Sequence, residues 1–379
     1  MSYLGEDIKK LGFGLMRLPL TDPNDGASVD VELLKTMVDA FLEKGFTYFD
    51  TAWMYCGFQS ECAIREALVK RHPRDSYTLA DKLHAGFLKT KEDRERIFQE
   101  QLRKTGVDYF DYYLLHDVGT DHYKTYQELD CFRWLEEKKA QGLARHIGFS
   151  YHDNAELLDR VLTKHPEVEF VQLQLNYLDW DSEGVQSRKC YETAVKHGKP
   201  VIVMEPVKGG TLARVPESVE KMFREARPEM SIPSWAIRFA ASLEHVMVVL
   251  SGMSNMEQLL DNTDYMADFQ PLSAQEQALV KKAVDAINST IAIPCTGCSY
   301  CTEGCPQRIA IPKYFSLYNA DLQEIKEKSW RPQGEYYTRL TMNFGKASDC
   351  LECGQCEQVC PQHLPIIRHL KDVAARFEK

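Results

Sequence analysis

Eight of the twelve cysteines lie in two late runs that share the spacing C-x2-C-x2-C-x3-C-P. The runs extend from Cys295 to Pro306 and from Cys350 to Pro361. Three thiolates spaced by two residues wrap one cubane cluster, because the tight turns between them expose backbone N–H groups that can bond to its sulfides. Structural zinc sites usually pair two C-x2-4-C knuckles across a longer loop, so zinc is the poorer match. The two runs therefore predict two 4Fe-4S clusters.

The spacing also resembles that of two-cluster bacterial ferredoxins, in which the fourth cysteine of each run ligates the other cluster. This resemblance implies two metal-ligand sets, one of Cys295, Cys298, Cys301 and Cys360 and the other of Cys350, Cys353, Cys356 and Cys305. A disulfide framework is not expected, because such scaffolds are small, secreted and cysteine-dense throughout. The four scattered cysteines, Cys56, Cys62, Cys131 and Cys190, are expected to pack as small hydrophobic residues.

A second group of reactive side chains follows short apolar runs earlier in the chain. Asp50, Lys82 and His116 each end such a run, and Tyr55 follows Asp50 by five residues. A ketone or aldehyde that receives hydride must also receive a proton, and a phenol is a poor acid unless its anion is stabilised. We expect Lys82 to favour the Tyr55 phenolate, Asp50 to hold Lys82 charged, and His116 to hydrogen-bond the substrate oxygen.

Before about residue 290, candidate strands alternate with helix-length segments. These strands must position the four reactive side chains. The candidate strands are Phe46 to Asp50, Tyr77 to Asp81, Tyr112 to Leu115, Ala144 to Phe149, Phe170 to Leu175, Pro200 to Met204 and Val246 to Leu250, with an N-terminal hairpin near Leu11 to Leu18. This rhythm predicts an α/β fold, a (β/α)8 TIM barrel with its catalytic groups at the C-terminal ends of the strands. An open Rossmann sheet is the poorer match, because Gly12-Phe13-Gly14 lacks the third glycine of a phosphate loop.

The composition shift near residue 290 predicts two domains, a barrel over residues 1–290 and an α-rich ferredoxin-like domain over residues 291–379. Ile311 to Lys328 is typical of an amphipathic helix that docks the second domain on the barrel. The aromatic residues Trp330, Tyr336, Tyr337 and Phe344 are expected to serve packing rather than electron transfer.

The sequence resembles the aldo/keto reductase family over roughly residues 5–290, through Asp50-Thr51-Ala52-Trp53-Met54-Tyr55, Lys82, His116 and Ile147-Gly148-Phe149-Ser150. The resemblance implies a nicotinamide dinucleotide across the barrel mouth and a tetrad in which Tyr55 is the general acid. The implied cofactor contacts are Gly14, Leu15, Met16, Asp50, Ser150, Gln172, Met204, Ser251, Gly252, Met253, Asn255, Gln258 and Asn262. No Lys or Arg lies between Ser251 and Gln258 to bind a 2'-phosphate, so the choice between NADP and NAD stays open.

Other loop residues are candidates for the substrate pocket. Trp53, Met54, His84, Tyr177 and Trp180 follow strands and favour apolar or aromatic carbonyl compounds or their alcohols. His152 and His197 flank helical stretches and are expected on the surface.

Net charge and hydropathy limit the partners. A formal net charge of -10 argues against nucleic acid, and no segment approaches the length of a membrane span, so we expect a cytoplasmic protein. Two function classes remain: an oxidoreductase whose clusters relay electrons from an external electron carrier, and an ordinary NAD(P)H-dependent reductase whose clusters are structural or redox-sensing. An electron carrier with a silent barrel is a third class, against which the intact tetrad argues.

Overall fold

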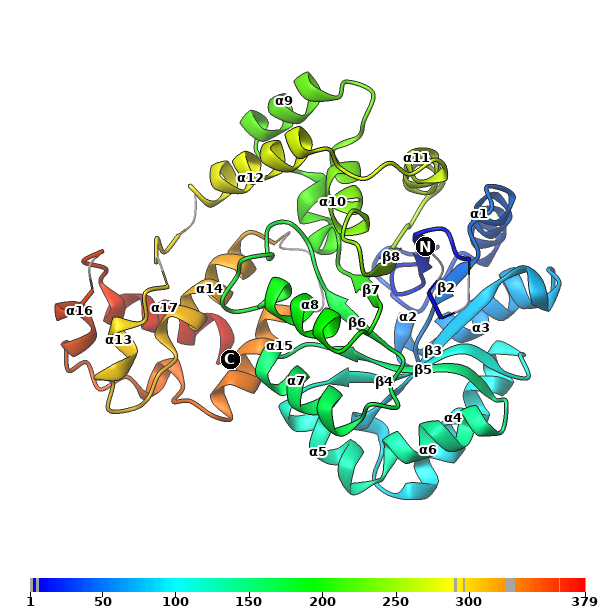
Figure 1. Ribbon diagram of the computed structural model, residues 1–379, viewed down its shortest axis with the longest axis horizontal. Coiled ribbons are helices and arrows are strands. Elements are labelled where there is room, and N and C mark those ends of the chain that lie inside the picture. The colour runs from blue at the N-terminus through cyan, green and yellow to red at the C-terminus, as the bar shows by residue number, and fades with distance from the viewer. Residues whose placement is uncertain are drawn as a thin grey trace.

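The computed structural model describes residues 3–4, 7–289, 292–295, 297–324, 331–360 and 362–378. Figure 1 shows a strand barrel ringed by helices, with a smaller helical unit against one side. Thr296, Lys328, Trp330 and Pro361, which the sequence analysis named or included in its motifs, lie outside the described residues. Within the described ranges, no helix combines the length and the apolar character needed to cross a membrane.

Eight parallel strands close the barrel in sequence order, as the strand–helix rhythm predicted. They are β1 (Leu11–Gly14), β2 (Tyr48–Asp50), β3 (Thr78–His84), β4 (Phe110–Val118), β5 (Ala144–Tyr151), β6 (Phe170–Gln174), β7 (Val201–Met204) and β8 (Val246–Ser251).

The predicted N-terminal hairpin is wrong, because Leu11–Gly14 is a barrel strand that pairs in parallel with both β2 and β8. A Cβ atom on Gly12 would lie 2.8 Å from side-chain carbons of Leu250 and Val248, so only glycine fits at this point of the barrel interior. The antiparallel bridge near the N-terminus lies later, between Leu20 and Val29.

Helices follow the strands, and most of them cover the outside of the barrel, whereas α2 lies at its mouth. They are α1 (Val31–Glu43), α2 (Tyr55–Phe58), α3 (Ser60–Ile64), α4 (Lys91–Thr105), α5 (Thr120–Glu128), α6 (Cys131–Ala140), α7 (Ala155–Lys164), α8 (Ser187–Lys196), α9 (Glu217–Ala226), α10 (Ile232–Ala241), α11 (Met256–Ala267) and α12 (Ala274–Asn288). Local sequence starts several of them: Asp30 and Asn154 accept backbone N–H bonds at the starts of α1 and α7, and Ser273 forms a capping box with Glu276 at α12.

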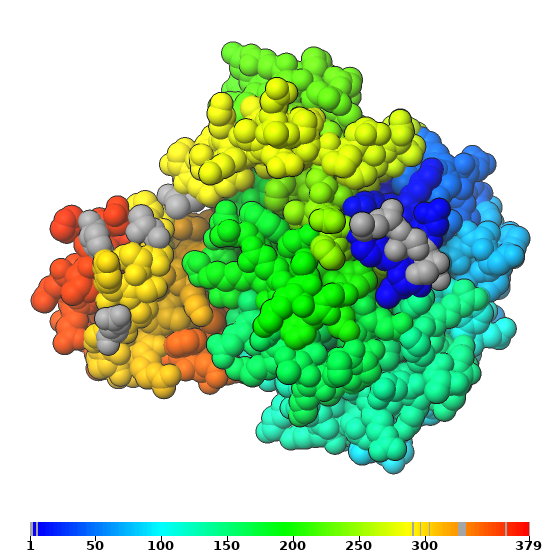
Figure 2. All heavy atoms as spheres, viewed as in Figure 1, coloured from blue at the N-terminus to red at the C-terminus, as the bar shows by residue number. Residues whose placement is uncertain are grey.

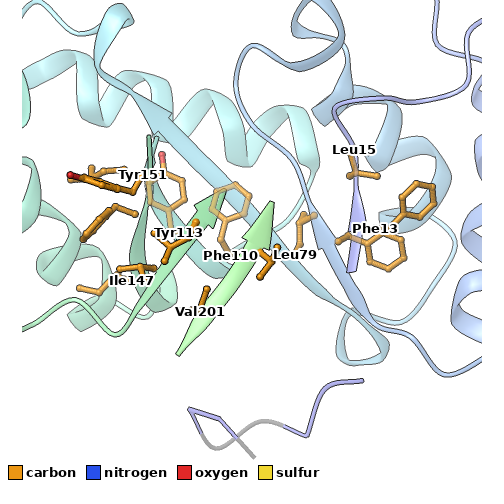
Figure 3. Packing of buried hydrophobic residues seen from close by; sticks show 14 of the residues in the cluster. Phe13, Leu15, Leu79, Phe110, Tyr113, Ile147, Tyr151 and Val201 are labelled. Atoms are coloured by element: carbon orange, nitrogen blue, oxygen red, sulfur yellow. The ribbon is translucent and has the colours of Figure 1, made fainter. Parts of the chain in front are cut away.

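Period-two alternation divides the strand residues between two cores. Phe13, Leu79, Tyr113, Ile147 and Val201 belong to the large core between the strands and the helices, and Figure 3 shows these residues contributed by several strands. Tyr48, Tyr112, Phe170 and Ile202 belong to a separate cluster inside the barrel. Continuing along β2, β3 and β4, the positions in phase with this inner cluster are Asp50, Lys82 and His116. The alternation therefore carries these three residues to one end of the barrel.

The C-terminal unit consists of α13 (Tyr300–Glu303), α14 (Ile311–Leu322), α15 (Pro332–Thr341), α16 (Gln355–Gln358) and α17 (Ile366–Phe377). Its own core includes Tyr314, Phe315, Tyr336 and Tyr337, with Phe344 packed against it. The expected docking helix is α14, whose Ser316 Oγ lies 3.0 Å from Ser182 Oγ of the barrel. In Figures 1 and 2 the unit lies beside α7 and α8.

Candidate active site and cluster sites

Lys82 is the centre of a buried charge cluster at the barrel mouth. Its Nζ atom lies 2.5 Å from Asp50 Oδ1, 2.7 Å from the Thr51 carbonyl oxygen and 3.5 Å from the Tyr55 hydroxyl oxygen. The Lys82 side chain is fully buried and that of Asp50 is 2% exposed. One ammonium group therefore contacts both the carboxylate and the phenol that the sequence analysis grouped with it.

The protonation states suit Tyr55 as a proton donor. Burial lowers the pKa of Lys82, but its interactions with neighbouring acidic groups, chiefly the charge of Asp50 and the hydrogen bond to it, raise the pKa overall. Burial also raises the pKa of Tyr55, and the Lys82 ammonium offsets this only in part. At neutral pH the phenol keeps its proton, and the adjacent positive charge is in place for the phenolate that forms when the proton leaves.

His116 faces Tyr55 edge to face, with ring centroids 5.7 Å apart. Burial, together with coulombic interactions with neighbouring His84 and Lys82, holds the pKa of His116 well below its usual value. Its Nδ1 atom is buried without a hydrogen-bond partner among the described residues. His116 is therefore a neutral imidazole that can hydrogen-bond a ligand oxygen without carrying charge.

A cavity of about 650 Å³ opens beside this cluster. Its lining comes from the C-terminal ends of the strands and the loops that follow them: Gly14, Met16, Arg17, Leu18, Leu20, Gly26, Asp50, Met54, Tyr55, Cys56, Gly57, His84, His116, Asp117, Ser150, His152, Gln172, Met204, Glu205, Leu250, Gly252 and Ser254. The volume is in the range of pockets that hold cofactors and drug-sized ligands.

The structure brings about half of the predicted cofactor contacts to this cavity. Gly14, Met16, Asp50, Ser150, Gln172, Met204 and Gly252 line it, whereas Leu15, Ser251, Met253, Asn255, Gln258 and Asn262 do not. Leu15 and Met253 are fully buried in the outer core. At the start of α11, the Gln258 side chain accepts the Ser254 backbone N–H, and the Asn255 side chain accepts the Gln258 backbone N–H. The Asn262 amide donates to Ser251 Oγ at 2.8 Å. These polar side chains therefore already have partners within the protein.

Two of the five predicted pocket residues, Met54 and His84, line the cavity. Tyr177 lies in a separate core with α9 and α12, Trp180 packs against Tyr191 and Phe239, and Trp53 lies under Lys104 and Phe58.

Sequence reasoning missed several cavity residues. His152, which it expected on the surface, is only 6% exposed and lines the cavity, because it continues the inward phase of β5 after Ser150. Among the described residues, Arg17 is the one Lys or Arg in the lining, and its Nη2 atom lies 3.2 Å from Glu205 Oε1. Glu205 directly follows Met204, so its place after a strand end was a readable signal.

The cavity wall fits a nicotinamide carboxamide. The Oε1 atom of Gln172 is buried without a hydrogen-bond partner among the described residues, although the side chain lines the cavity. Ser150 Oγ accepts the Asp117 backbone N–H at 2.8 Å, which leaves its hydroxyl hydrogen to donate. An unpaired acceptor and an available donor side by side match the NH2 and C=O groups of a carboxamide.

The eight late cysteines gather around two cavities. One is lined by Cys295, Cys298, Cys301 and Cys360, and the other by Cys305, Cys350, Cys353 and Cys356. All eight thiols are free rather than disulfide-bonded. Four thiolates around one cavity are a donor set that fits a 4Fe-4S cluster, and the grouping places the fourth cysteine of each run with the other run.

Comparison with known proteins finds two family matches in separate parts of the chain. Residues 10–285 match the aldo/keto reductase family, and residues 294–364 match a 4Fe-4S dicluster domain. An uncharacterized oxidoreductase of Bacillus subtilis, YqkF, is 23% identical over 313 residues, which are 75% of this chain and 92% of that protein. An aldo-keto reductase of Mycobacterium sp. strain MCS is 33% identical over 159 residues, which are 38% of this chain and 52% of that protein.

Solved structures show the same barrel. The holo form of an aldo-keto reductase from Bacillus halodurans matches with a TM-score of 0.58 and 23% identity, covering 74% of this chain and 93% of that one. An aldo/keto reductase from Klebsiella pneumoniae, solved with NADP and acetate, matches with a TM-score of 0.58 and 19% identity, covering 73% and 91%. The chain belongs to the aldo/keto reductase family and is an oxidoreductase of that type with a C-terminal 4Fe-4S dicluster domain.

Proposed function

We propose that the protein reduces an aldehyde or ketone with a nicotinamide cofactor, with Tyr55 as the general acid. The observation that carries this proposal is the contact of one buried ammonium, Lys82 Nζ, with both Asp50 and Tyr55 at the end of a cofactor-sized cavity. A nicotinamide held by Ser150 and Gln172 supplies hydride when it is bound.

The side chains of the tetrad divide the proton chemistry. The neutral His116 imidazole hydrogen-bonds the substrate oxygen and orients it toward Tyr55. Tyr55 donates its hydroxyl proton to that oxygen as negative charge develops there. The Lys82 ammonium stabilises the phenolate that remains, and Asp50 keeps the ammonium oriented.

For the nucleotide, we propose NADP or NAD without a fixed preference. Two similar structures from Klebsiella pneumoniae hold NADP and NADPH. Arg17 lines the cavity, and its pairing with Glu205 leaves part of the guanidinium for a phosphate. Met204 adds a thioether that can pack against a flat ring.

We further propose that two 4Fe-4S clusters, held by the crossed cysteine sets, relay electrons between an external carrier and the barrel. The ring contact between His152 on the cavity wall and Tyr336 in the C-terminal core supports a relay. A second candidate, clusters with a structural or redox-sensing role, is favoured by the buried Arg339, which anchors the C-terminal helices on the barrel. The proposed domain boundary lies at residue 290, and the proposed setting is the cytoplasm, where thiols stay reduced.

Anaerobic purification with iron and sulfide analysis, followed by spectra with NADH and with NADPH, tests the cofactor assignments. Tyr55→Phe, which deletes only the proton donor, should abolish most carbonyl reduction and leave nucleotide binding intact. Tyr48→Phe is the matched control, because its hydroxyl is buried inside the barrel and lacks a hydrogen-bond partner among the described residues. Equal turnover of Tyr55→Phe and the control would refute the acid role.

A further inference from the structure

Arg339, on α15 of the C-terminal unit, reaches the mouth of the barrel. Its side chain is 1% exposed, and it forms a two-pronged ion pair in which Nη1 lies 2.9 Å from Asp117 Oδ1 and Nη2 lies 2.8 Å from Asp117 Oδ2. The same guanidinium donates to Asp121 Oδ1 at 3.1 Å and to the His152 carbonyl oxygen at 2.6 Å. A fork-to-fork pair of this kind fixes the orientation of both partners.

Asp117 directly follows His116 and lies within the candidate active site. Its φ angle is +59°, in the left-handed region that residues other than glycine seldom adopt. Its backbone N–H donates to Ser150 Oγ, and its side chain lines the cavity. The backbone of Asp117, which follows His116 and donates to Ser150, is thus held in an unusual conformation. The charged side chain of Asp117 is anchored by Arg339.

Gly119 shows that the barrel is shaped to admit this arginine. A Cβ atom at position 119 would lie 2.5 Å from Arg339 Cζ and 2.6 Å from Nε. The backbone of Gly119 is extended, with φ of -160°, so its conformation does not itself require glycine. The absence of a side chain there is explained by the approach of the guanidinium.

α15 also belongs to the core of the cluster-bearing unit. Tyr336 and Tyr337, just before Arg339 in the sequence, lie in one core with Cys301, Cys356 and Cys360. One short helix therefore connects the surroundings of the cysteine cavities to the segment that carries His116.

We propose that Arg339 is a positioning residue of the barrel active site, supplied by the C-terminal unit, and that it holds Asp117 so that His116 and Ser150 keep their places. This inference rests on the proposed carbonyl reduction. It also makes barrel turnover depend on a folded cluster-bearing unit even when NAD(P)H supplies the electrons.

The test uses the full-length, iron-loaded protein with Arg339→Gln, Arg339→Lys and Gly119→Ala. Arg339→Gln should lower kcat about tenfold or more, with the KM for nucleotide changed less than about threefold, and should speed amide hydrogen exchange across residues 112–123. Arg339→Lys, which can still reach one carboxylate oxygen, should restore part of kcat. Gly119→Ala keeps the charge but displaces the guanidinium, so it should lower kcat in the same direction.

Arg74→Gln is the matched control, since Arg74 pairs with Asp111 at the opposite end of β4. It should leave kcat and exchange across residues 112–123 near wild type. The role of Arg339 would be overturned if Arg339→Gln and Gly119→Ala both kept wild-type kcat and wild-type amide exchange. If Tyr55→Phe were inactive in the same assays, the proposed function would still stand. If the wild type reduces no carbonyl compound, the proposed function fails, and the exchange rates alone decide whether Arg339 holds the segment. If Arg339→Gln does not fold, Gly119→Ala decides in the same way.

Discussion

His152 on the cavity wall and Tyr336 on α15 meet edge to face across the junction of the barrel and the C-terminal unit. Their ring centroids are 5.9 Å apart, with an angle of 77° between the planes. His152 lines the active-site cavity, and Tyr336 belongs to the core that contains Cys301, Cys356 and Cys360. A continuous path of packed side chains therefore runs from the cavity toward the cysteines.

This contact predicts the effect of Tyr336→Leu on electron transfer. Removing the ring opens a gap between the two units, so re-oxidation of pre-reduced clusters by substrate should slow several-fold, whereas Tyr336→Phe should retain the wild-type rate. Stopped-flow absorbance after anaerobic mixing measures both rates. Iron content and unfolding temperature must match the wild type for the comparison to hold. Equal re-oxidation by the Leu variant would remove this contact from the route and favour structural clusters.

The buried pair of Lys82 and Asp50 predicts a joint loss of stability and activity in Lys82→Met. Removing one partner leaves the other charge buried and unpaired, which costs about 3–5 kcal/mol of unfolding free energy. The double variant Lys82→Met/Asp50→Asn should recover much of that stability but no carbonyl reduction, because Tyr55 still lacks its ammonium. Urea titrations and steady-state rates measure the two quantities.

A second buried pair provides the control for this prediction. Lys208 Nζ lies 2.6 Å from Asp179 Oδ1, and its side chain is 1% exposed. Lys208→Met should lower stability by a similar amount while carbonyl reduction stays within about threefold of wild type. If both lysine variants lose activity equally, the loss reports general destabilisation rather than the chemistry of Lys82.

Much of the barrel site could be predicted because, in a parallel barrel, residues at the C-terminal ends of the strands all lie at the same end of the barrel. Each of Asp50, Lys82 and His116 ends an apolar run, and strands of one direction bring their ends together. Two failures lie just beyond the strands. Leu15 and Met253 follow the ends of β1 and β8, beside the cavity residues Gly14 and Gly252, but their side chains are fully buried in the outer core. A position next to a strand end did not by itself fix which face these two side chains take.

Other features had no readable signal. The path of Arg339 into the barrel depends on how two segments far apart in the sequence pack together, and no local pattern links position 339 to position 117. Likewise, the polar residues around α11 were expected to contact the cofactor, but Asn255 and Gln258 accept backbone N–H groups near the start of that helix.

His84 predicts a loss of stability in mild acid. Burial and the charge of His122 lower the pKa of His84 to about 4, and its Nδ1 atom accepts the Gly86 backbone N–H at 3.0 Å, which the protonated ring cannot do. Between pH 6.5 and pH 4 the unfolded chain binds more protons than the folded protein, so the free energy of unfolding falls as pH falls through this window. Urea midpoints at pH 7.5 and pH 5 should differ less in His84→Asn than in wild type. An unchanged difference would show that other groups, such as His116, account for the acid sensitivity.

The grouping of the cysteines predicts the iron content of two double variants. If ligation is crossed, Cys295→Ala/Cys360→Ala removes two ligands from one cluster, and about four of the expected eight irons should remain. Cys350→Ala/Cys360→Ala then damages both clusters and should leave little iron, although both substitutions fall within one sequence run. Uncrossed ligation reverses the two outcomes, because Cys350 and Cys360 would share a cluster while Cys295 and Cys360 would not. Iron and sulfide analysis with low-temperature EPR after anaerobic purification separates the two arrangements. Cys190→Ala, which changes a buried barrel cysteine, is the control for loss of a thiol elsewhere.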